Sequence, residues 1–408
     1  MKLVLYKWAR FYLVALALLL ASLTNVSAED QLRPAVGKPL QEAQKLMAAG
    51  KNKAALSPIE AAESVGQLSA YEQFIINQMK ASALSAAGDT AGAVRAFEKV
   101  LASGRLSSQE TLKTTEAIAS IYLRAKQYPE AIRWLHKYKA QGGAKPSTLA
   151  FLPQAYYLAG DYKRSAEESA AQIASLEKSK QKPSETQLKL FAASLAKIND
   201  MMGYSQALER LVRYYPKPEY WQDVIQRTAR KPGFSRNLEL DKLRLLRATG
   251  NLDQARDYVE MAQLSLQAEL PGEAKAIVDE GYEKKVLGQG QERDVERQGR
   301  LRKLVDERYA ADFKAITESD AEILAAESGD SLVETGLAYV TYGEAVKGLK
   351  MMEAGIRKGG LRFPDQAQLR LGYAYYYAGD KAKAKAAFAK VAGKDGARDL
   401  ARLWRQVP

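Results

Sequence analysis

The chain contains no cysteine and a single histidine, His136, among its 408 residues. The absence of cysteine excludes disulfide bonds, cysteine nucleophiles and thiolate metal ligands. One histidine is too few for a histidine metal cluster or a two-histidine relay. His136 follows the apolar Leu135, at a position where the helical pattern predicts an exposed side chain. We therefore expect no catalytic residues, no metal and no cofactor.

Two weak signals for chemistry remain. The segment 142–148, GGAKPST, lacks the G-x-x-x-x-G-K-S/T spacing of a phosphate-binding loop, so it does not predict a nucleotide site. Glu327-Ser328 resembles the start of the catalytic motif of peptidoglycan lytic enzymes, but the glycine-rich elements that should follow are missing. A lytic enzyme is therefore a remote alternative, and we expect a protein that is not an enzyme.

Long apolar runs are also scarce, and one stands at the N-terminus. A basic segment comes first, an apolar run covers about Phe11 to Leu20, and Val26-Ser27-Ala28 follows. This order is typical of a secretory signal, and the run is shorter than the ~20 residues of a membrane-spanning helix. We predict cleavage after Ala28 and a periplasmic location in a Gram-negative bacterium. A retained anchor or a buried first helix is the alternative.

The net charge is strongly positive. It is +13 for the whole chain, and the first 28 residues contain three basic and no acidic side chains, which leaves +10 after cleavage. In an exported protein this excess favours anionic lipid, lipopolysaccharide, cell wall or an acidic protein over nucleic acid as partner. The alternative is that Lys and Arg solvate the outer faces of helices.

Glycine stands in a recurring pattern. A break, often Gly followed by Asp or Asn, precedes a segment in which a small residue is followed by apolar residues four and seven positions later. Gly379-Asp380, for example, precedes Ala384, Phe388 and Val391. Glycine can end a helix in the left-handed conformation, and aspartate can cap the next helix. The pattern therefore predicts antiparallel helix pairs.

The same pattern recurs upstream. Breaks stand at or near Gly50, Gly88, Lys126, Gly160, Gly203 and Gly250. The small residues after them are separated by 38, 38, 34, 42 and 48 positions; they are Ala55, Ala93, Ala131, Ser165, Ala207 and Ala255. These steps fit a period of about 34 residues with loops of variable length. From about Leu40 to Val391 the chain resembles the tetratricopeptide repeat (TPR) family. The resemblance implies an all-α solenoid of stacked antiparallel helix pairs, a TPR-like right-handed superhelix.

The sequence departs from the TPR pattern in several places. The family's tryptophan is absent from the first helix of every repeat, and its proline is mostly missing. Pro153 replaces a small residue, so a helix should begin or kink there. Ala274 follows Ala255 by only 19 positions, and Pro271 predicts a helix start between them. The register of the repeats between about 215 and 345 is left open.

We expect four segments along the chain. They are a cleaved signal peptide at 1–28, a TPR-like array at 29–286, a charged amphipathic helical connector at 287–330, and TPR-like repeats with a capping helix at 331–408. The connector carries an apolar stripe within charged residues, which favours a helix packed on one face; the stripe is Leu301, Leu304, Val305, Tyr309 and Phe313. A docking arm for a partner helix is the alternative.

The TPR resemblance implies a non-enzymatic periplasmic scaffold that mediates protein–protein interactions in a cell-envelope assembly. In this family the inner face of each repeat's first helix usually forms the ligand groove. The corresponding residues are Arg124, Gln154, Tyr157, Arg244, Arg247, Tyr373, Tyr376 and Tyr377. Aromatic rings pack against an extended peptide or a sugar, and arginines bind carboxylates. Burial in the core is the competing explanation for each tyrosine.

The expected partners are envelope proteins or extended peptides, with anionic glycan, lipopolysaccharide or a membrane surface as further candidates and no nucleic acid. The alternative function is a glycan-binding subunit of an envelope polysaccharide-export or secretion machine.

Overall fold

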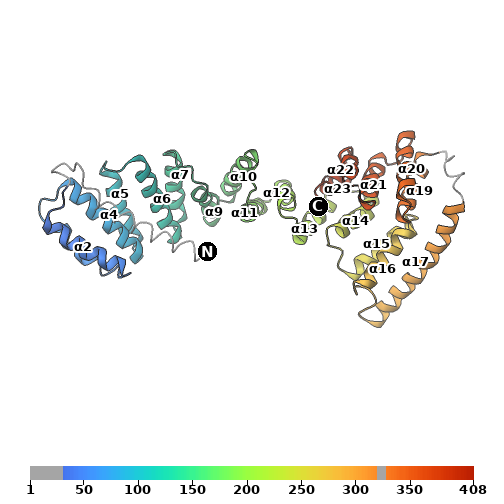
Figure 1. The fold of residues 1–408 in the computed structure, drawn as a ribbon, viewed down its shortest axis with the longest axis horizontal. Helices are drawn as coiled ribbons and strands as arrows, with labels where there is room; N and C mark the ends of the chain where they lie inside the picture. Colours follow the sequence, from blue (N-terminus) through green and yellow to red (C-terminus); the bar gives the residue numbers. More distant parts are fainter. Residues whose placement is uncertain (1–30, 319–327) are drawn as a thin grey trace. The chain divides into compact units, whose positions relative to one another are not determined.

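The computed structural model describes residues 31–318 and 328–408 (Figure 1). Regular structure in these two ranges is helical throughout, and the predicted all-α class of paired helices is confirmed. The predicted signal peptide and Glu327 lie outside the described residues. Within them, no helix combines the length and the apolar character needed to cross a membrane. By their contacts the helices form two units, divided between Ser179 and Lys180.

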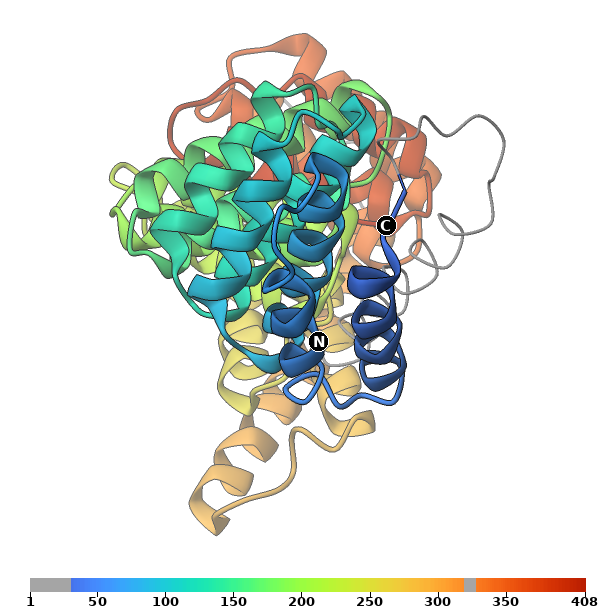
Figure 2. The same ribbon diagram turned by 90° about the vertical axis from the view of Figure 1, so that its left-hand side faces the viewer.

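The first unit is a stack of helix pairs, α2 with α3, α4 with α5, α6 with α7, and α9 with α10. Figure 2 shows its first helices layered behind one another. The helices are α2 (Pro34–Ala48), α3 (Leu56–Glu63), α4 (Ala70–Ala87), α5 (Thr90–Ala102), α6 (Ser108–Arg124), α7 (Tyr128–Ala140), α8 (Pro146–Leu149), α9 (Phe151–Leu158) and α10 (Tyr162–Lys178).

The turns of the first unit follow the predicted pattern. Gly88 ends α4 in the left-handed conformation, at φ +89°, and the Asp89 carboxylate accepts from the Gly92 amide at the start of α5. The small residues after the breaks are buried where two helices meet, as Ala93 and Ala131 show with no exposed surface. Local turn chemistry and small contact residues therefore fix each helix pair.

Two single-residue expectations fall in this unit. Helix α9 begins two residues before Pro153, in agreement with the expected helix start. His136 is exposed, as predicted, and its Nε2 lies 2.7 Å from the hydroxyl oxygen of Tyr156.

The second unit contains the remaining helices. They are α11 (Glu185–Lys197), α12 (Met201–Tyr214), α13 (Pro218–Ala229), the short η2 (Arg236–Leu238), α14 (Glu239–Ala248), α15 (Ala255–Gln267), α16 (Pro271–Glu283), α17 (Glu292–Glu318), α19 (Gly329–Thr341), α20 (Ala345–Lys358), α21 (Pro364–Tyr377), α22 (Lys381–Ala389) and α23 (Ala397–Trp404).

Three predictions about helix positions can be compared with the first part of this unit. Helix α16 begins at Pro271, as predicted. The break expected at Gly203 is wrong, because Gly203 lies inside α12 and the turn falls at Asn199, which takes a positive φ of 57°. The predicted amphipathic helix is present as α17, which packs on α15 and α16. The division of the chain at 286 and 330 stays a prediction.

The last helices fold back onto the middle of the second unit (Figure 1). Helix α23 packs on α21 and α22 and also on α13 and α14. The Ser235 amide donates to the Asp395 carbonyl at 2.8 Å, and Arg402 of α23 forms an ion pair with Glu209 of α12 at 2.8 Å. Helix α23 therefore joins the last helix pair to helices from earlier in the unit, and its role as a capping helix stays a prediction.

Glycine allows two close helix contacts here. A Cβ atom on Gly372 would lie 2.4 Å from the Phe388 ring, so this glycine admits α22 against α21. Helices α19 and α20 approach still more closely, because a Cβ on Gly348 would lie 2.3 Å from the Gly336 carbonyl oxygen. Backbone thus packs against backbone in the α19–α20 pair.

Candidate partner-binding groove

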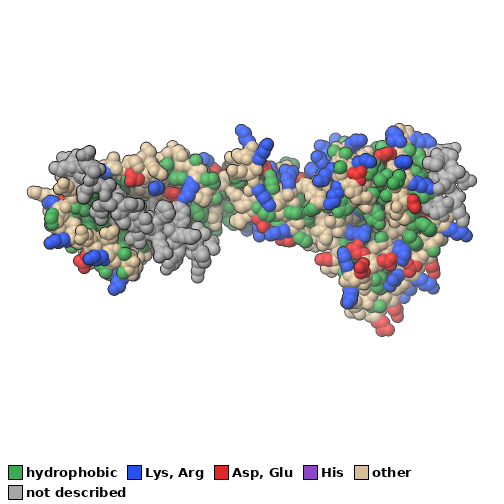
Figure 3. All heavy atoms as spheres, in the orientation of Figure 1, with side chains coloured by type: hydrophobic (Ala, Val, Ile, Leu, Met, Phe, Trp, Pro, Cys, Tyr) green, Lys and Arg blue, Asp and Glu red, His purple; other side chains and the backbone are tan. Residues whose placement is uncertain are grey.

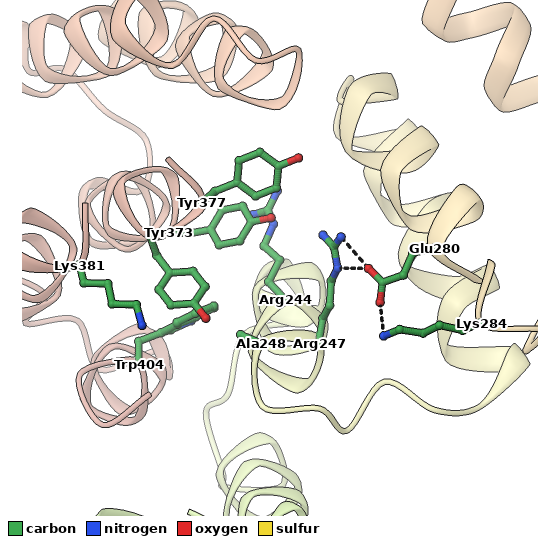
Figure 4. Close-up of a pocket in the computed structure, with 10 residues that line it drawn as sticks. Arg244, Arg247, Ala248, Glu280, Lys284, Tyr373, Tyr377, Lys381 and Trp404 are labelled. Carbon is green, nitrogen blue, oxygen red and sulfur yellow. Dashed lines mark hydrogen bonds and ion pairs between the residues drawn. The ribbon is translucent and has the colours of Figure 1, made fainter. Parts of the chain in front are cut away.

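Five of the eight predicted partner residues line one groove of about 520 Å³ in the second unit (Figure 4). We call it the α14–α21 groove; it is lined by Arg244, Arg247, Ala248, Glu280, Lys284, Tyr373, Tyr376, Tyr377, Lys381 and Trp404. One wall comes from α14 and α16, and the other comes from α21, α22 and α23. The groove exists because the last helices fold back onto α14.

The other three predicted residues lie in the first unit. Arg124 is exposed, and its Nη2 donates to the Ser85 hydroxyl at 2.9 Å. Gln154 is exposed, and the Tyr157 ring packs edge-on against Tyr162 with the centroids 5.1 Å apart.

The floor of the groove is a buried ion network. Arg244 donates to both Glu273 carboxylate oxygens, at 2.8 and 2.6 Å, and to Asp241 at 2.7 Å. Tyr373 donates to the same Glu273 carboxylate at 2.8 Å, although the two residues are 100 positions apart. Arg244 is 2% exposed and Tyr373 is 4% exposed. The hydroxyl of Tyr373 is therefore bound inside the protein, and burial in the core, the competing explanation, holds for this residue.

The charges of this network stabilise one another. Burial alone would lower the pKa of Arg244, but the neighbouring Glu273 and Asp241 carboxylates raise it above its ordinary value. Burial alone would raise the pKa of Glu273, yet Arg244 lowers it. Burial, with the Glu273 charge, raises the pKa of Tyr373 well above its ordinary value. The floor therefore keeps its protonation state near neutral pH.

The rim on the α14–α16 side is a second, more exposed ion cluster. Arg247 donates to Glu280 Oε2 at 2.7 Å, and Lys284 donates to Glu280 Oε1 at 2.7 Å (Figure 4). Tyr258 also donates to Glu280 Oε1, at 3.0 Å. Burial alone would raise the pKa of Glu280, but the hydrogen bond from Lys284 and the charge of Arg247 lower it. Glu280 is thus a carboxylate at neutral pH and a weak base.

The opposite wall is aromatic. The Trp404 ring lies 4.9 Å from that of Tyr376 and 5.9 Å from that of Tyr373. Tyr377 is 38% exposed, and its ring is 5.9 Å from that of Tyr373. Among the described residues, the hydroxyls of Tyr376 and Tyr377 have no hydrogen-bond partner. Burial raises the pKa of both tyrosines, so both hydroxyls are protonated donors at neutral pH.

No family model and no curated protein matches the chain. Several solved structures are similar to it. The structure of Naa15/Naa10 bound to HypK-THB is 14% identical with a TM-score of 0.31, and the match covers 90% of this chain and 58% of that one. The TPR domain of P58(IPK) is 14% identical with a TM-score of 0.23, covering 91% and 98%. The pentatricopeptide repeat protein PPR10 from maize is 15% identical with a TM-score of 0.33, covering 90% and 61%.

These similarities concern architecture alone, and the chain's own helix pairs decide its class. Consecutive antiparallel pairs follow one another, and each turn of the predicted pattern carries a residue with positive φ, such as Gly88, Lys126, Gly160 and Gly379. The chain is an all-α helical repeat protein with the paired-helix architecture that the TPR resemblance implies. Its sequence resemblance to the TPR family is confirmed at the level of the fold.

Five groove residues were not predicted from the sequence; they are Ala248, Glu280, Lys284, Lys381 and Trp404. Glu280 and Lys284 stand four positions apart on α16, a spacing at which opposite charges meet on a helix. Lys381 begins α22, and Trp404 ends α23. Neither residue occupies an inner-face position of a repeat's first helix. Only the return of α21–α23 onto α14 brings them into the groove.

The surface charge has no comparable focus on the face drawn in Figure 3. Lys and Arg side chains there are spread over both units, and Asp and Glu side chains are interspersed with them. On this face the basic excess solvates the helices, and the groove remains the place where cations and aromatic rings converge.

Proposed function

We propose that the protein is a non-enzymatic scaffold that binds a partner protein through the α14–α21 groove. The observation that carries this proposal is the convergence of Arg247, Lys284 and Lys381 with Tyr376 and Tyr377 in one open groove. Tyrosine and arginine are enriched where proteins bind each other, because they offer large contact areas and directed hydrogen bonds. The helix pairs of the second unit supply the two walls of this surface.

Binding fits this groove better than catalysis. Among its lining residues Glu280 is the single carboxylate, and Arg247, Lys284 and Tyr258 already donate to it. A general base needs a pKa near the working pH, whereas these donors lower the pKa of Glu280. The arrangement therefore disfavours the lytic-enzyme alternative, whose Glu327 lies outside the described residues.

The proposed setting is the bacterial cell envelope. Its support is the basic and apolar N-terminal segment ending at Val26-Ser27-Ala28. Expression of the full chain in a Gram-negative host should yield a periplasmic protein that begins at Glu29. Cell fractionation and N-terminal mass spectrometry measure this directly. A full-length cytoplasmic product would overturn the proposed location and leave the groove untouched.

The scaffold function is tested by crosslinking from the groove in cells. A photoreactive amino acid at Tyr377 should trap a protein, whereas the same label at the exposed Lys385 on α22 should not. Adding Tyr376→Ala should reduce the trapped product. Stability should change by no more than about 0.5 kcal/mol when the partly exposed Tyr377 is replaced.

Three outcomes are decisive for the scaffold. Trapping that depends on the groove supports it. Equal trapping from position 385 would remove the groove as the partner site. Trapped glycan without protein would favour the polysaccharide-export alternative, to which the aromatic wall is also suited.

A further inference from the structure

The two ion clusters of the α14–α21 groove differ in access. The side chains of Arg244 and Glu273 in the floor are 1% and 0% exposed. In the rim, the side chains of Arg247 and Glu280 are 24% and 18% exposed, and that of Lys284 is 58% exposed. A carboxylate from outside could reach the rim cations, whereas the floor is sealed. The rim is therefore the part of the groove where an ion pair can be exchanged.

The rim and the aromatic wall offer mainly hydrogen-bond donors. Arg247, Lys284, Tyr376 and Tyr377 all present N–H or O–H groups, and neither tyrosine hydroxyl has a partner among the described residues. Lys381 donates to the main-chain oxygen of Pro408 at 2.7 Å. The one acidic acceptor, Glu280, is shared by three donors. A ligand that fits this donor set has to bring acceptors.

We propose that the groove binds an acidic, extended peptide segment, and that Glu280 occupies the place which a carboxylate of this segment takes on binding. This rests on the proposed scaffold function. A carboxylate only accepts hydrogen bonds, and an arginine fork matches its two oxygens. A neutral sugar presents hydroxyls that need both donors and acceptors, which this groove does not supply in balance. An apolar side chain next to the ligand's carboxylate would lie against Tyr376 and Trp404.

Glu280 has a function in the free protein, although it competes with the carboxylate of the peptide for Arg247 and Lys284. In the free protein it holds Arg247 and Lys284 in place and keeps two cations from repelling each other. In the complex the peptide carboxylate replaces it on Arg247, and Glu280 retains its hydrogen bond from Tyr258. The site is thereby preorganised, and its affinity is reduced by the competition.

Two substitutions test this proposal, and we expect them to change the affinity for an acidic peptide in opposite directions. Glu280→Gln keeps an oxygen for Tyr258 and frees the cations, so it should tighten binding of an acidic peptide about three- to tenfold. Arg247→Gln should weaken it about tenfold or more. A merely structural ion pair predicts that both changes weaken binding. Glu283→Gln, exposed on the same helix, and Arg256→Gln, exposed on α15, make the same charge changes outside the groove.

The probes are fluorescein-labelled peptides of alternating Glu and Leu, Gln and Leu, or Lys and Leu, added to the mature full-length chain. Fluorescence anisotropy should give the tightest binding for the Glu-Leu peptide, and Tyr376→Phe should weaken it. Equal binding of the Gln-Leu peptide would overturn the proposal. The proposal would also be overturned if Glu280→Gln did not tighten binding of the Glu-Leu peptide more than Glu283→Gln does.

The remaining outcomes separate this inference from the scaffold. If Tyr377 traps a protein in cells but no acidic peptide binds, the scaffold stands and the carboxylate exchange is wrong. If an oligogalacturonate binds and the Glu-Leu peptide does not, the ligand is an acidic glycan and the peptide assignment is wrong. If the Glu-Leu peptide binds as expected but Tyr377 traps nothing, the exchange site is real and the cellular scaffold role is overturned.

Discussion

The two units use the same helix pairs but hold them together differently. In the first unit, the side-chain hydrogen bonds between described residues span at most 39 positions of the sequence, as between Arg124 and Ser85. In the second unit Arg402 reaches Glu209 across 193 positions, and Lys231 reaches Asp399 across 168. The first unit is thus a stack in which each repeat meets its neighbours, whereas the second closes on itself.

The interiors differ in the same way. Glu72 is the one fully buried charged side chain among the described residues of the first unit, and it pairs with the partly exposed Arg33. The second unit buries Asp241, Arg244 and Glu273 together. A repeat stack needs only apolar contacts between neighbours, while closure brings polar faces of distant helices together. A buried ion network then specifies how they meet.

The largest expected effect comes from removing the centre of that network. Arg244→Met leaves Glu273 buried without its bidentate cation and Asp241 with only Arg370, at 3.5 Å, which should cost about 3–5 kcal/mol. Hydrogen exchange measured by mass spectrometry should show the loss in α11–α23, with α2–α10 unchanged. Arg256→Met, whose side chain is 82% exposed, is the matched control and should change stability little. Equal loss of protection in both units would mean that they do not unfold separately.

A smaller effect is expected where two helices touch through glycine. Gly348→Ala places a Cβ against the Gly336 carbonyl oxygen and should destabilise the second unit by about 1–3 kcal/mol. The control is Gly299→Ala in α17, where a Cβ meets no atom within 4 Å. That change should stabilise the helix by up to about 1 kcal/mol, because alanine is the better helix former. Thermal unfolding of both variants should therefore shift in opposite directions, and a shared direction would contradict the close contact.

The smallest expected effect is a local response to acid at one end of the first unit. The hydrogen bond from Arg33, with main-chain donors from Ser69 and Arg33, lowers the pKa of Glu72 from 4.5 to about 2. A lowered pKa in the folded state means that the stabilisation is present above pH 4.5 and is lost as the pH falls toward 2. Exchange in α2–α4 should accelerate over that range.

Glu72→Gln tests this assignment, because the variant should be less stable at neutral pH and should show a weaker pH response in α2–α4. Glu98→Gln, at an exposed position on α5, should leave the response intact. An unchanged acid response in Glu72→Gln would assign it to other carboxylates.

Several features that depend on residues close together in the sequence were predicted correctly. The small residues Ala93 and Ala131, the turn at Gly88 and the start of α16 at Pro271 follow from spacing and capping within one helix pair. The turn before α12 was misplaced at Gly203, because Asn199 can adopt the left-handed conformation and Asp200 caps the helix in its place. Side-chain chemistry near a turn thus permits more than one position for the break.

The groove could be predicted only in part. Arg247, Tyr376 and Tyr377 were found because they lie on the inner faces of their own helices. Trp404 and Glu280 were not found, since their position depends on the packing of α14 on α23 and on the hydrogen bond between Arg247 of α14 and Glu280 of α16, which no repeat spacing encodes. The burial of Tyr373 has the same origin, because its partner Glu273 lies 100 positions away.

The return of α23 onto α13 also has a consequence for the order of folding. Low contact order favours rapid folding, since short loops cost little entropy to close. The stack up to Ser179 can therefore acquire its structure while later residues are still being synthesised. The second unit cannot fold in this stepwise way, because Lys231 and Glu209 are made 168 and 193 positions before their partners Asp399 and Arg402. The α14–α21 groove is consequently complete only after α23 has been made, so that a chain that stops before α23 has helix pairs but no assembled binding site.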